Sequence, residues 1–253
     1  MTLNPENKKD REKLRRLFLV KKTELQMILD RGFSIVYSHA LHFDRSQISF
    51  TSLNYEFMLN PNLTFEEFLE WRNKNTNGVF KTRENFSSIY YKNVQNAQGQ
   101  TFILPLLVMY LDSPAHDKTT GAYMMKLNKM METTKYHNII LITEQGLSTK
   151  EINRLKTSTA GITFTYFQDS DLAFNRTKFA LAPIRVIYYE PNQVPRFEEE
   201  EQLSFKQLPF ITSNDLLSKW YGATSGGVFT ELIMGVETSS EVFYRTVVIS
   251  TVK

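Results

Sequence analysis

The chain has 253 residues, of which 42% are hydrophobic and 23% are charged. This composition is too apolar for a disordered chain and is sufficient to bury a core. The absence of cysteine excludes disulfides, a thiol nucleophile and cysteine-ligated zinc or iron–sulfur centres, and it is consistent with a reducing compartment. No signal-like apolar stretch follows the N-terminal charges, and the most apolar run, residues 102–111, is too short to cross a bilayer. We therefore expect an intracellular protein with no cofactor or metal.

The charge is unevenly distributed along the chain. The formal net charge is +3, but residues 1–22 carry eight Lys or Arg against three Asp or Glu, whereas residues 198–253 carry four against eight. Contact with phosphates needs clustered Lys and Arg, so any nucleic-acid contact is expected from the N-terminal part. The alternative for these charges is the solvated face of a helix.

Two helices are predicted near the N-terminus. Residues 10–31 carry apolar residues at helical spacing, and Gly32 is expected to end that helix. The apolar positions are Leu14, Leu17, Phe18, Leu25, Ile28 and Leu29. Residues 60–76 contain a capping box, Thr64 followed by Glu67, which predicts a second helix. Residues 76–100 favour short strands or loops, with weak alternation at Ile89 and Tyr91, as do residues 38–57 at Ile48 and Phe50.

The middle of the chain has an α/β pattern. Residues 101–111 predict a buried strand, in which Pro105 favours an edge position or a bulge. Residues 121–136 predict a helix and residues 138–143 a buried strand, so the two strands should be parallel with a right-handed crossover. Ser148 with Glu151 forms another capping box, which predicts a short helix to residue 156, and residues 162–167 alternate as a strand.

The composition changes again around residue 195. Residues 191–201 contain two prolines and four consecutive glutamates, which predicts a linker between an N-terminal domain of residues 1–190 and a C-terminal domain of residues 202–253. In the C-terminal domain, Asn214 is expected to cap a short helix that ends at Gly222. Residues 228–234 and 242–249 predict strands, so the domain is a small α+β module.

Catalytic motifs are largely missing from the sequence. Gly226 and Gly227 have no lysine nearby and favour a backbone turn over a phosphate loop. His39 and His42 lack a nearby carboxylate that would complete a helical metal pattern. From the residues alone the chain is a two-domain α/β protein without a visible active site.

Several segments resemble, in order, the eukaryotic-type fifth subunit shared by nuclear DNA-dependent RNA polymerases, which has a shorter archaeal homologue. The run from Arg16 to Phe33, which ends in Asp-Arg-Gly-Phe, resembles the family's opening helix. The segment that begins at Leu63 and the stretches 121–131 and 138–143 resemble the next helix and the crossover helix and strand. The C-terminal domain carries the most specific match, at the spacing of the family's assembly module. Its residues are Gln207, Leu208, Pro209, Asp215, Trp220, Tyr221, Gly222, Gly226, Val228, and the run from Tyr244 to Val248.

The resemblance implies a fold, a function and a set of sites. The fold is an α/β N-terminal jaw domain, with a nuclease-like sheet that has no active site, and a small α+β C-terminal assembly domain. The implied function is a non-catalytic structural subunit that docks on the largest polymerase subunit and forms part of the lower jaw beside downstream duplex DNA. The implied docking residues are Leu208, Pro209, Asp215, Trp220, Tyr221, Gly222, Tyr244 and Arg245. The residues implied to lie near DNA are Ser148, Thr149, Lys150 and Lys156.

The chain also departs from the family. Where relatives often have Thr-Pro-Ser-Ala, this chain has Ser-Thr-Lys-Glu from Ser148, and a basic Lys-Arg-Gly is replaced by Thr-Ser-Gly-Gly from Thr224. Residues 38–57 and 76–100 look longer than usual. Such divergence favours a large DNA virus or a fast-evolving eukaryote as the source, and therefore a viral factory, a virion or the nucleus as the location.

Two other functions compete with this one. The first is a metal-dependent nuclease of restriction-type fold, which needs two acidic residues and a lysine around a metal. Glu144, at a strand end with Lys150 nearby, is the best local candidate, but the sequence offers no convincing second carboxylate on a neighbouring strand. The second is a free-standing adaptor that belongs to no polymerase.

Overall fold

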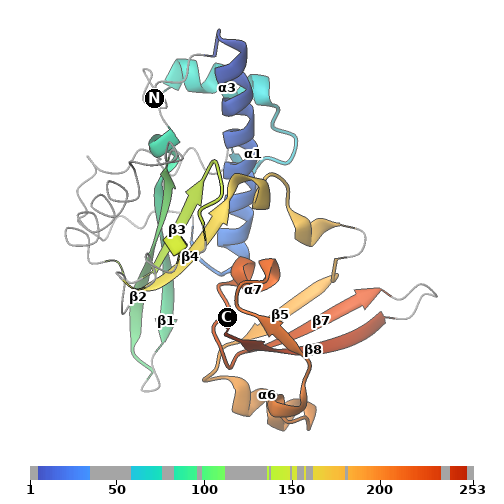
Figure 1. Cartoon of the computed structure of the whole chain (residues 1–253). Coiled ribbons are helices and arrows are strands. Elements are labelled where there is room, and N and C mark those ends of the chain that lie inside the picture. Colours follow the sequence, from blue (N-terminus) through green and yellow to red (C-terminus); the bar gives the residue numbers. More distant parts are fainter. Residues whose placement is uncertain are drawn as a thin grey trace. The chain divides into compact units, whose positions relative to one another are not determined.

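The protein folds as two compact units, each with its own mixed β-sheet. The computed structural model describes residues 5–34, 58–75, 83–95, 99–111, 136, 138–148, 150–152, 157, 162–179, 182–234 and 240–249. Unit 1 is Met1–Phe174 and unit 2 is Asn175–Lys253. Both units combine helices with a β-sheet, which confirms the expected α/β character of the chain (Figure 1).

The division between the units differs from the expected linker at residues 191–201. Residues up to Phe174 contact mainly one another, and so do the residues from Asn175 onwards. Most of the expected linker forms helix α6 (Val194–Glu201), in which Val194 and Phe197 are buried. The prolines and glutamates of this segment hid the two apolar positions, which lie three residues apart and so face one side of a helix. The preceding strand β5 (Arg185–Tyr189) also belongs to unit 2, because it pairs with a strand of that unit's sheet.

Helix α1 (Lys8–Asp30) confirms the first predicted helix and extends it by two residues at its start. The Asn7 side chain accepts a hydrogen bond from the Lys9 backbone N–H and caps the N-terminus. At the other end Gly32 has φ +74°, a conformation that glycine adopts without strain. Helix α3 (Phe65–Asn75) begins at the predicted capping box, since Thr64 and Glu67 bond to each other's backbone N–H groups.

The sheet of unit 1 has the strand order β1-β2-β3-β4. Its strands are β1 (Ser88–Gln95), β2 (Thr101–Leu111), β3 (Asn138–Thr143) and β4 (Thr163–Gln168). β1 and β2 are antiparallel, whereas β2, β3 and β4 are parallel, as predicted for the β2–β3 pair. Pro105 pairs with β1 only, because β3 begins its pairing at Leu107. The expected edge position is therefore correct for this half of the strand.

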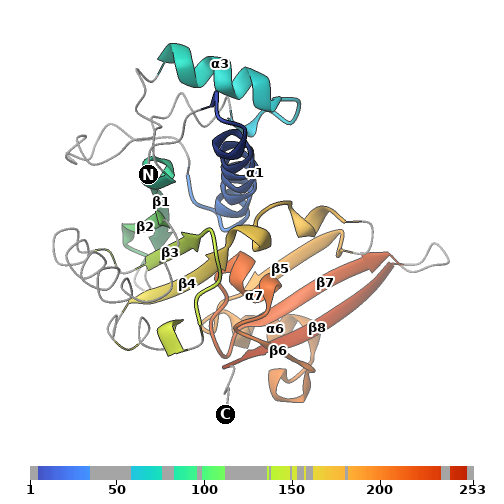
Figure 2. The same cartoon turned by 45° about the horizontal axis from the view of Figure 1, so that its top comes forward.

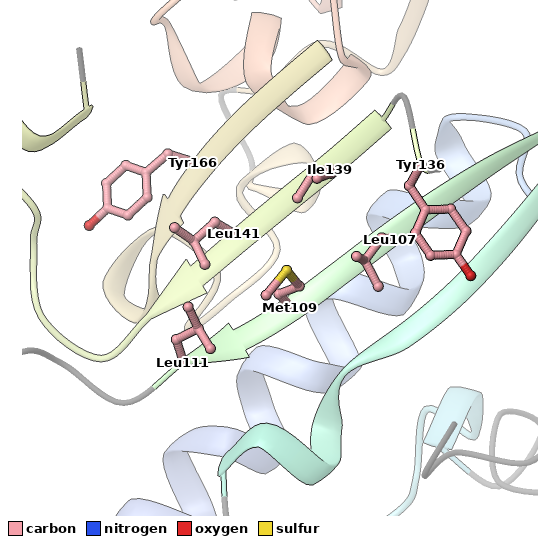
Figure 3. Close-up of a cluster of buried hydrophobic side chains, with 7 residues drawn as sticks. All are labelled: Leu107, Met109, Leu111, Tyr136, Ile139, Leu141 and Tyr166. Atoms are coloured by element: carbon pink, nitrogen blue, oxygen red, sulfur yellow. The ribbon is translucent and has the colours of Figure 1, made fainter. Parts of the chain in front are cut away.

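The two faces of this sheet carry different cores. One face packs on α1, where Lys21 and Glu24 contact Tyr90 of β1 and Tyr110 of β2. The opposite face carries an apolar cluster, drawn in Figure 3. Its members are Leu107, Met109, Leu111, Tyr136, Ile139, Leu141 and Tyr166. Alternation along β2 and β3 thus buries both faces of the central strands.

Unit 2 is a four-stranded sheet between two short helices. The strand order is β5-β7-β8-β6, with β6 (Phe210–Thr212), β7 (Val228–Met234) and β8 (Ser240–Val248). The strands β7 and β8 were predicted within two residues. Helix α7 (Leu216–Tyr221) packs on one face of the sheet and α6 on the other (Figures 1 and 2).

The cap of helix α7 differs from the prediction by one residue. The side chain of Asp215, and not Asn214, accepts the hydrogen bond from the Leu217 backbone N–H. Gly222 ends the helix with φ +66°, as expected.

Some expectations lie outside the described residues. These are most of the crossover helix at 121–136, the segments 38–57 and 76–82, and residues 153–156 of the short helix that begins after Ser148. His39, His42, Thr149 and Lys156 lie there too. In the part that the structure does describe, no helix combines the length and the apolar character that crossing a membrane requires.

Candidate functional site

A fully buried ion pair joins α1 to the sheet of unit 1. Lys21 Nζ lies 2.7 Å from Glu24 Oε2, and both side chains are 0% exposed. Lys21 also donates to the Phe86 carbonyl and the Ser88 hydroxyl, while Glu24 accepts from the hydroxyls of Tyr90 and Tyr110. Burial lowers the pKa of Lys21, and the adjacent Glu24 opposes part of that shift. Closed to solvent on all sides, this network holds α1 in register rather than binding a ligand.

A second buried pair lies beside the first. Arg83 of the 3-10 helix η2 (Arg83–Phe86) donates through both terminal nitrogens to the Asp169 carboxylate, which is 1% exposed. The Arg83 guanidinium also lies 5.5 Å from the centre of the Tyr110 ring. Burial raises the pKa of Asp169, while the bonded Arg83 and nearby Arg16 lower it. Tyr110 thus connects the two buried pairs.

A nuclease site would need a second carboxylate beside Glu144 on a neighbouring strand. Asp169, directly after β4, is in that position. Thr143 pairs with Gln168 in the parallel sheet, so Glu144 and Asp169 follow adjacent strand ends. Both are already engaged by cations, since Asp169 binds Arg83 and Glu144 lies 3.7 Å from Lys13. Within the described ranges, no three His, Asp or Glu side chains gather in a way that could hold a metal ion. The carboxylates of Glu144 and Asp169, each paired with a cation, therefore fit a structural role better than a metal centre.

The loop after β3, which carries the expected DNA-proximal residues, is held by Tyr166. The Tyr166 hydroxyl accepts from the Leu147 backbone N–H at 2.8 Å and contacts the Thr143 hydroxyl at 3.0 Å. The predicted capping box follows, with Ser148 and Glu151 bonded to each other's backbone N–H groups. Lys150 is exposed in the helical turn that begins there.

Several basic residues near the start of α1 are exposed, whereas Lys21 is fully buried. Lys8, Lys9, Arg15 and Arg16 are exposed, while Arg11 forms an ion pair with Glu66 of α3. These exposed cations fit the weak, sequence-independent attraction of phosphates that the charge pattern predicts.

The predicted docking residues of unit 2 fall into two groups on opposite faces of its sheet. Leu208 and Tyr244 pack with Phe197 on the α6 side. Trp220, Tyr221 and Arg245 lie on the α7 side, because Arg245 follows Tyr244 in β8 and successive side chains alternate.

Several of these residues have structural roles. Asp215 and Gly222 are the two caps of α7, and Tyr221 packs edge-on against the Phe229 ring at 5.8 Å. Pro209 is exposed, and its carbonyl accepts from the Thr246 backbone N–H. Variants of Tyr221 or Gly222 would therefore report the folding of unit 2 as well as any docking.

Trp220 and Arg245 are brought together in one open pocket of about 250 Å³. Helix α7 contributes Leu216, Leu217 and Trp220, and β5 contributes Val186. Residues on either side of a gap in the described chain, Thr177, Ala182 and Pro183, also line the pocket. It is the candidate functional site of unit 2.

The charged residues of the pocket are Arg176, Glu231 and Arg245. Glu231 is only 2% exposed, and its two carboxylate oxygens accept from Nε and Nη2 of Arg245 at 2.7 and 2.5 Å. This two-pronged pair fixes the guanidinium. Glu231 and Arg176 were not predicted from the sequence. Glu231 could have been found as the lone carboxylate within an apolar strand pattern.

On the α6 side, the Tyr244 hydroxyl donates to Glu201 Oε2 at 2.7 Å. This hydrogen bond, together with burial and the negative charge of Glu201, raises the pKa of Tyr244 from 10.0 to about 12. The folded protein therefore keeps the Tyr244 proton at pH values where the unfolded chain loses it. The bond's stabilising effect is complete below the unfolded pKa and is lost as the pH rises towards the folded pKa.

We expect Tyr244→Phe to lower the free energy of unfolding by about 1 kcal/mol at neutral pH. The difference between the variant and the wild type should shrink as the pH rises from about 9 to about 12, because the wild type alone has a Tyr244 proton to lose on unfolding. Urea titrations of both proteins at each pH measure this. A difference that stays constant over the range would contradict the assigned hydrogen bond.

No protein-family model matches the chain, and no curated protein matches it either. Its resemblance to a polymerase subunit therefore depends on the residues quoted above.

Proposed function

We propose that the chain is a non-catalytic structural subunit of a multisubunit DNA-dependent RNA polymerase. In this proposal unit 2 docks on the largest subunit, and unit 1 forms part of the lower jaw near downstream duplex DNA. The observation that carries it is the C-terminal motif, whose residues all lie within unit 2. There Asp215, Gly222 and Tyr244 serve as helix caps and core contacts, so the motif describes one compact module.

The surface of unit 2 supports a docking role. Most of the exposed large apolar side chains among the described residues lie in this unit: Phe179, Ile184, Leu203, Phe210, Met234, Val242, Phe243 and Ile249. Single exposed apolar residues are ordinary, whereas a concentration of them in a small module is typical of an interaction surface. The docking residues implied by the resemblance do not include these exposed side chains; of its aromatic members, Trp220 is buried, whereas Tyr221 and Tyr244 are half-buried.

Unit 1 supports a position near DNA through charge. Lys8, Lys9, Arg15 and Arg16 on α1 and Lys150 after β3 are exposed. Contacts of this kind add affinity for any sequence and weaken as salt rises. We propose weak, sequence-independent attraction of duplex DNA at this unit.

Co-purification with polymerase subunits tests the docking role. We expect Met234→Ser with Val242→Ser to reduce recovery of the largest subunit about fivefold or more, because both side chains are exposed on the same face of the sheet and only an interface would bury them. Phe102→Ser with Ile103→Ser is the matched control, since these residues are similarly exposed on unit 1. The control should co-purify like the wild type.

Three results would contradict the proposal. Equal recovery with both double variants would remove the docking surface from unit 2. Magnesium-dependent cleavage of duplex DNA by the purified protein, abolished by Glu144→Ala, would favour the nuclease alternative. Recovery of the wild type without any large polymerase subunit would favour the free-standing adaptor.

A further inference from the structure

The pocket of unit 2 combines an apolar wall with a fixed guanidinium. Leu216, Leu217 and Trp220 form the wall on the α7 side. At its charged end, Arg245 uses Nε and Nη2 for Glu231, which leaves the Nη1 amino group outside the pair. Because Glu231 is buried and both of its oxygens are occupied, the pocket offers an incoming group hydrogen-bond donors and no free carboxylate.

The surroundings of the pocket are basic within an otherwise acidic module. Arg176 lines the pocket and is exposed. Lys178, which is also exposed, follows Arg176 in the same 3-10 helix, η4 (Arg176–Lys178), and residues 175–179 contain no acidic residue. By contrast, residues 198–253 contain eight acidic against four basic residues. The charge at this site therefore complements an anion.

The size of the pocket indicates what kind of ligand it takes. Its volume of about 250 Å³ is below the range of roughly 300–1,000 Å³ that is usual for small-molecule sites. An open pocket of this size with apolar walls fits one large side chain of a partner protein, which is how anchor residues bind at interfaces.

We propose that this pocket binds a peptide segment in which a large apolar side chain is followed by carboxylates. The apolar side chain fills the space between Trp220, Leu217 and Val186. The carboxylates accept hydrogen bonds from Arg245, which Glu231 holds in place, and pair with Arg176 at the mouth. This goes beyond the proposed function, because it assigns a peptide-recognition site. The site recognises an apolar side chain followed by carboxylates, and that preference does not depend on which protein contains the segment.

Three peptides test the proposal on the full-length, ¹⁵N-labelled protein by NMR titration. The probe is acetyl-Leu-Asp-Glu-amide, and the matched controls are acetyl-Leu-Asn-Gln-amide, which lacks the charges, and acetyl-Ala-Asp-Glu-amide, which lacks the apolar side chain. We expect the probe to shift the Trp220 indole N–H and the Arg245 Nε–H signals saturably. Its dissociation constant should be about tenfold lower than that of either control, as expected for one charge-assisted contact or one buried side chain.

The chain's other tryptophan, Trp71 of unit 1, gives an internal reference, because its indole N–H signal should not move. Ala182→Trp places a bulky ring at the pocket wall and should abolish the probe-induced shifts. Ile184→Trp is the matched control, because Ile184 is 59% exposed and does not line the pocket. Arg176→Gln, at an exposed position, should reduce the preference for the charged over the uncharged peptide, and the preference that remains is due to Arg245.

The proposal would be overturned by equal binding of all three peptides, or by shifts that appear in Ala182→Trp as strongly as in Ile184→Trp. A response without saturation, or one confined to unit 1, would overturn it too. These outcomes are independent of co-purification with polymerase subunits, so a failure of the pocket and a failure of the proposed function are distinguishable.

Discussion

A fragment of residues 202–253 is expected to be unfolded in isolation. This fragment was the C-terminal domain predicted from the sequence, but it lacks β5, which pairs along β7, and helix α6. The buried side chains of Val194 and Phe197 would be lost from the core around Leu208 and Val228. A module of about 50 residues has little core to lose, so removal of a strand and a helix should abolish cooperative folding.

A longer fragment, residues 175–253, is the control and should fold cooperatively, because it keeps the complete sheet. Circular dichroism with urea titration and an NMR spectrum of each fragment measure the difference. In the longer fragment, Phe197→Ala should cost about 3–5 kcal/mol, since Phe197 is fully buried. A cooperative transition for residues 202–253, or a negligible cost of Phe197→Ala, would restore the linker hypothesis.

The second large effect is expected at Glu24 in unit 1. Glu24→Ala leaves the fully buried Lys21 without its counter-charge and leaves the hydroxyls of Tyr90 and Tyr110 without their acceptor. Breaking one side of a buried ion pair costs about 3–5 kcal/mol. We expect a loss of this size in the free energy of unfolding, measured by urea titration with a probe in unit 1.

Two controls separate burial from charge. The double variant Lys21→Met, Glu24→Leu removes both charges and should recover much of the stability, because a buried ion pair and an apolar pair of similar volume are often close in free energy. Glu144→Ala breaks the partly exposed pair with Lys13 and should cost less than about 1 kcal/mol. Similar costs for Glu24→Ala and Glu144→Ala would show that burial of the Lys21–Glu24 pair is not decisive.

The local elements of the fold were predictable where one residue type sets the backbone. The capping boxes at Thr64 and Ser148, and the helix ends at Gly32 and Gly222, were predicted at the residues where the structure has them. Capping depends on contacts within three or four residues, so the sequence contains the whole interaction. The parallel pair of β2 and β3 was predictable for a related reason, since the order of strand, helix and strand restricts the connection.

The unit boundary was not predictable from composition. Glutamates and prolines dominate residues 191–201, and the two residues that bind α6 to the sheet, Val194 and Phe197, are a small part of that segment. Whether such a helix packs depends on the sheet face it meets, which is built by strands elsewhere in the chain. Strand β5 was missed for the same reason, because its partner β7 lies about 40 residues later.

The buried charges of unit 1 were missed although the sequence carried a signal. Lys21 and Glu24 fall on the apolar stripe of α1, between Phe18 and Leu25. Charged residues on such a stripe indicate burial with partners, but those partners, Tyr90 and Tyr110, come from strands more than 60 residues away. Glu231 in unit 2 is likewise a buried charge in an apolar segment, and its partner Arg245 comes from another strand, since Glu231 lies in β7 and Arg245 in β8.

The most direct test of the proposed function is the set of proteins that bind the native chain. We would immunoprecipitate the native protein in stringent salt and identify its partners, with their stoichiometry, by mass spectrometry. We expect recovery of two very large RNA polymerase subunits in amounts equal to that of the chain. Recovery of the chain alone, or with partners that include no polymerase subunit, would contradict the proposed function.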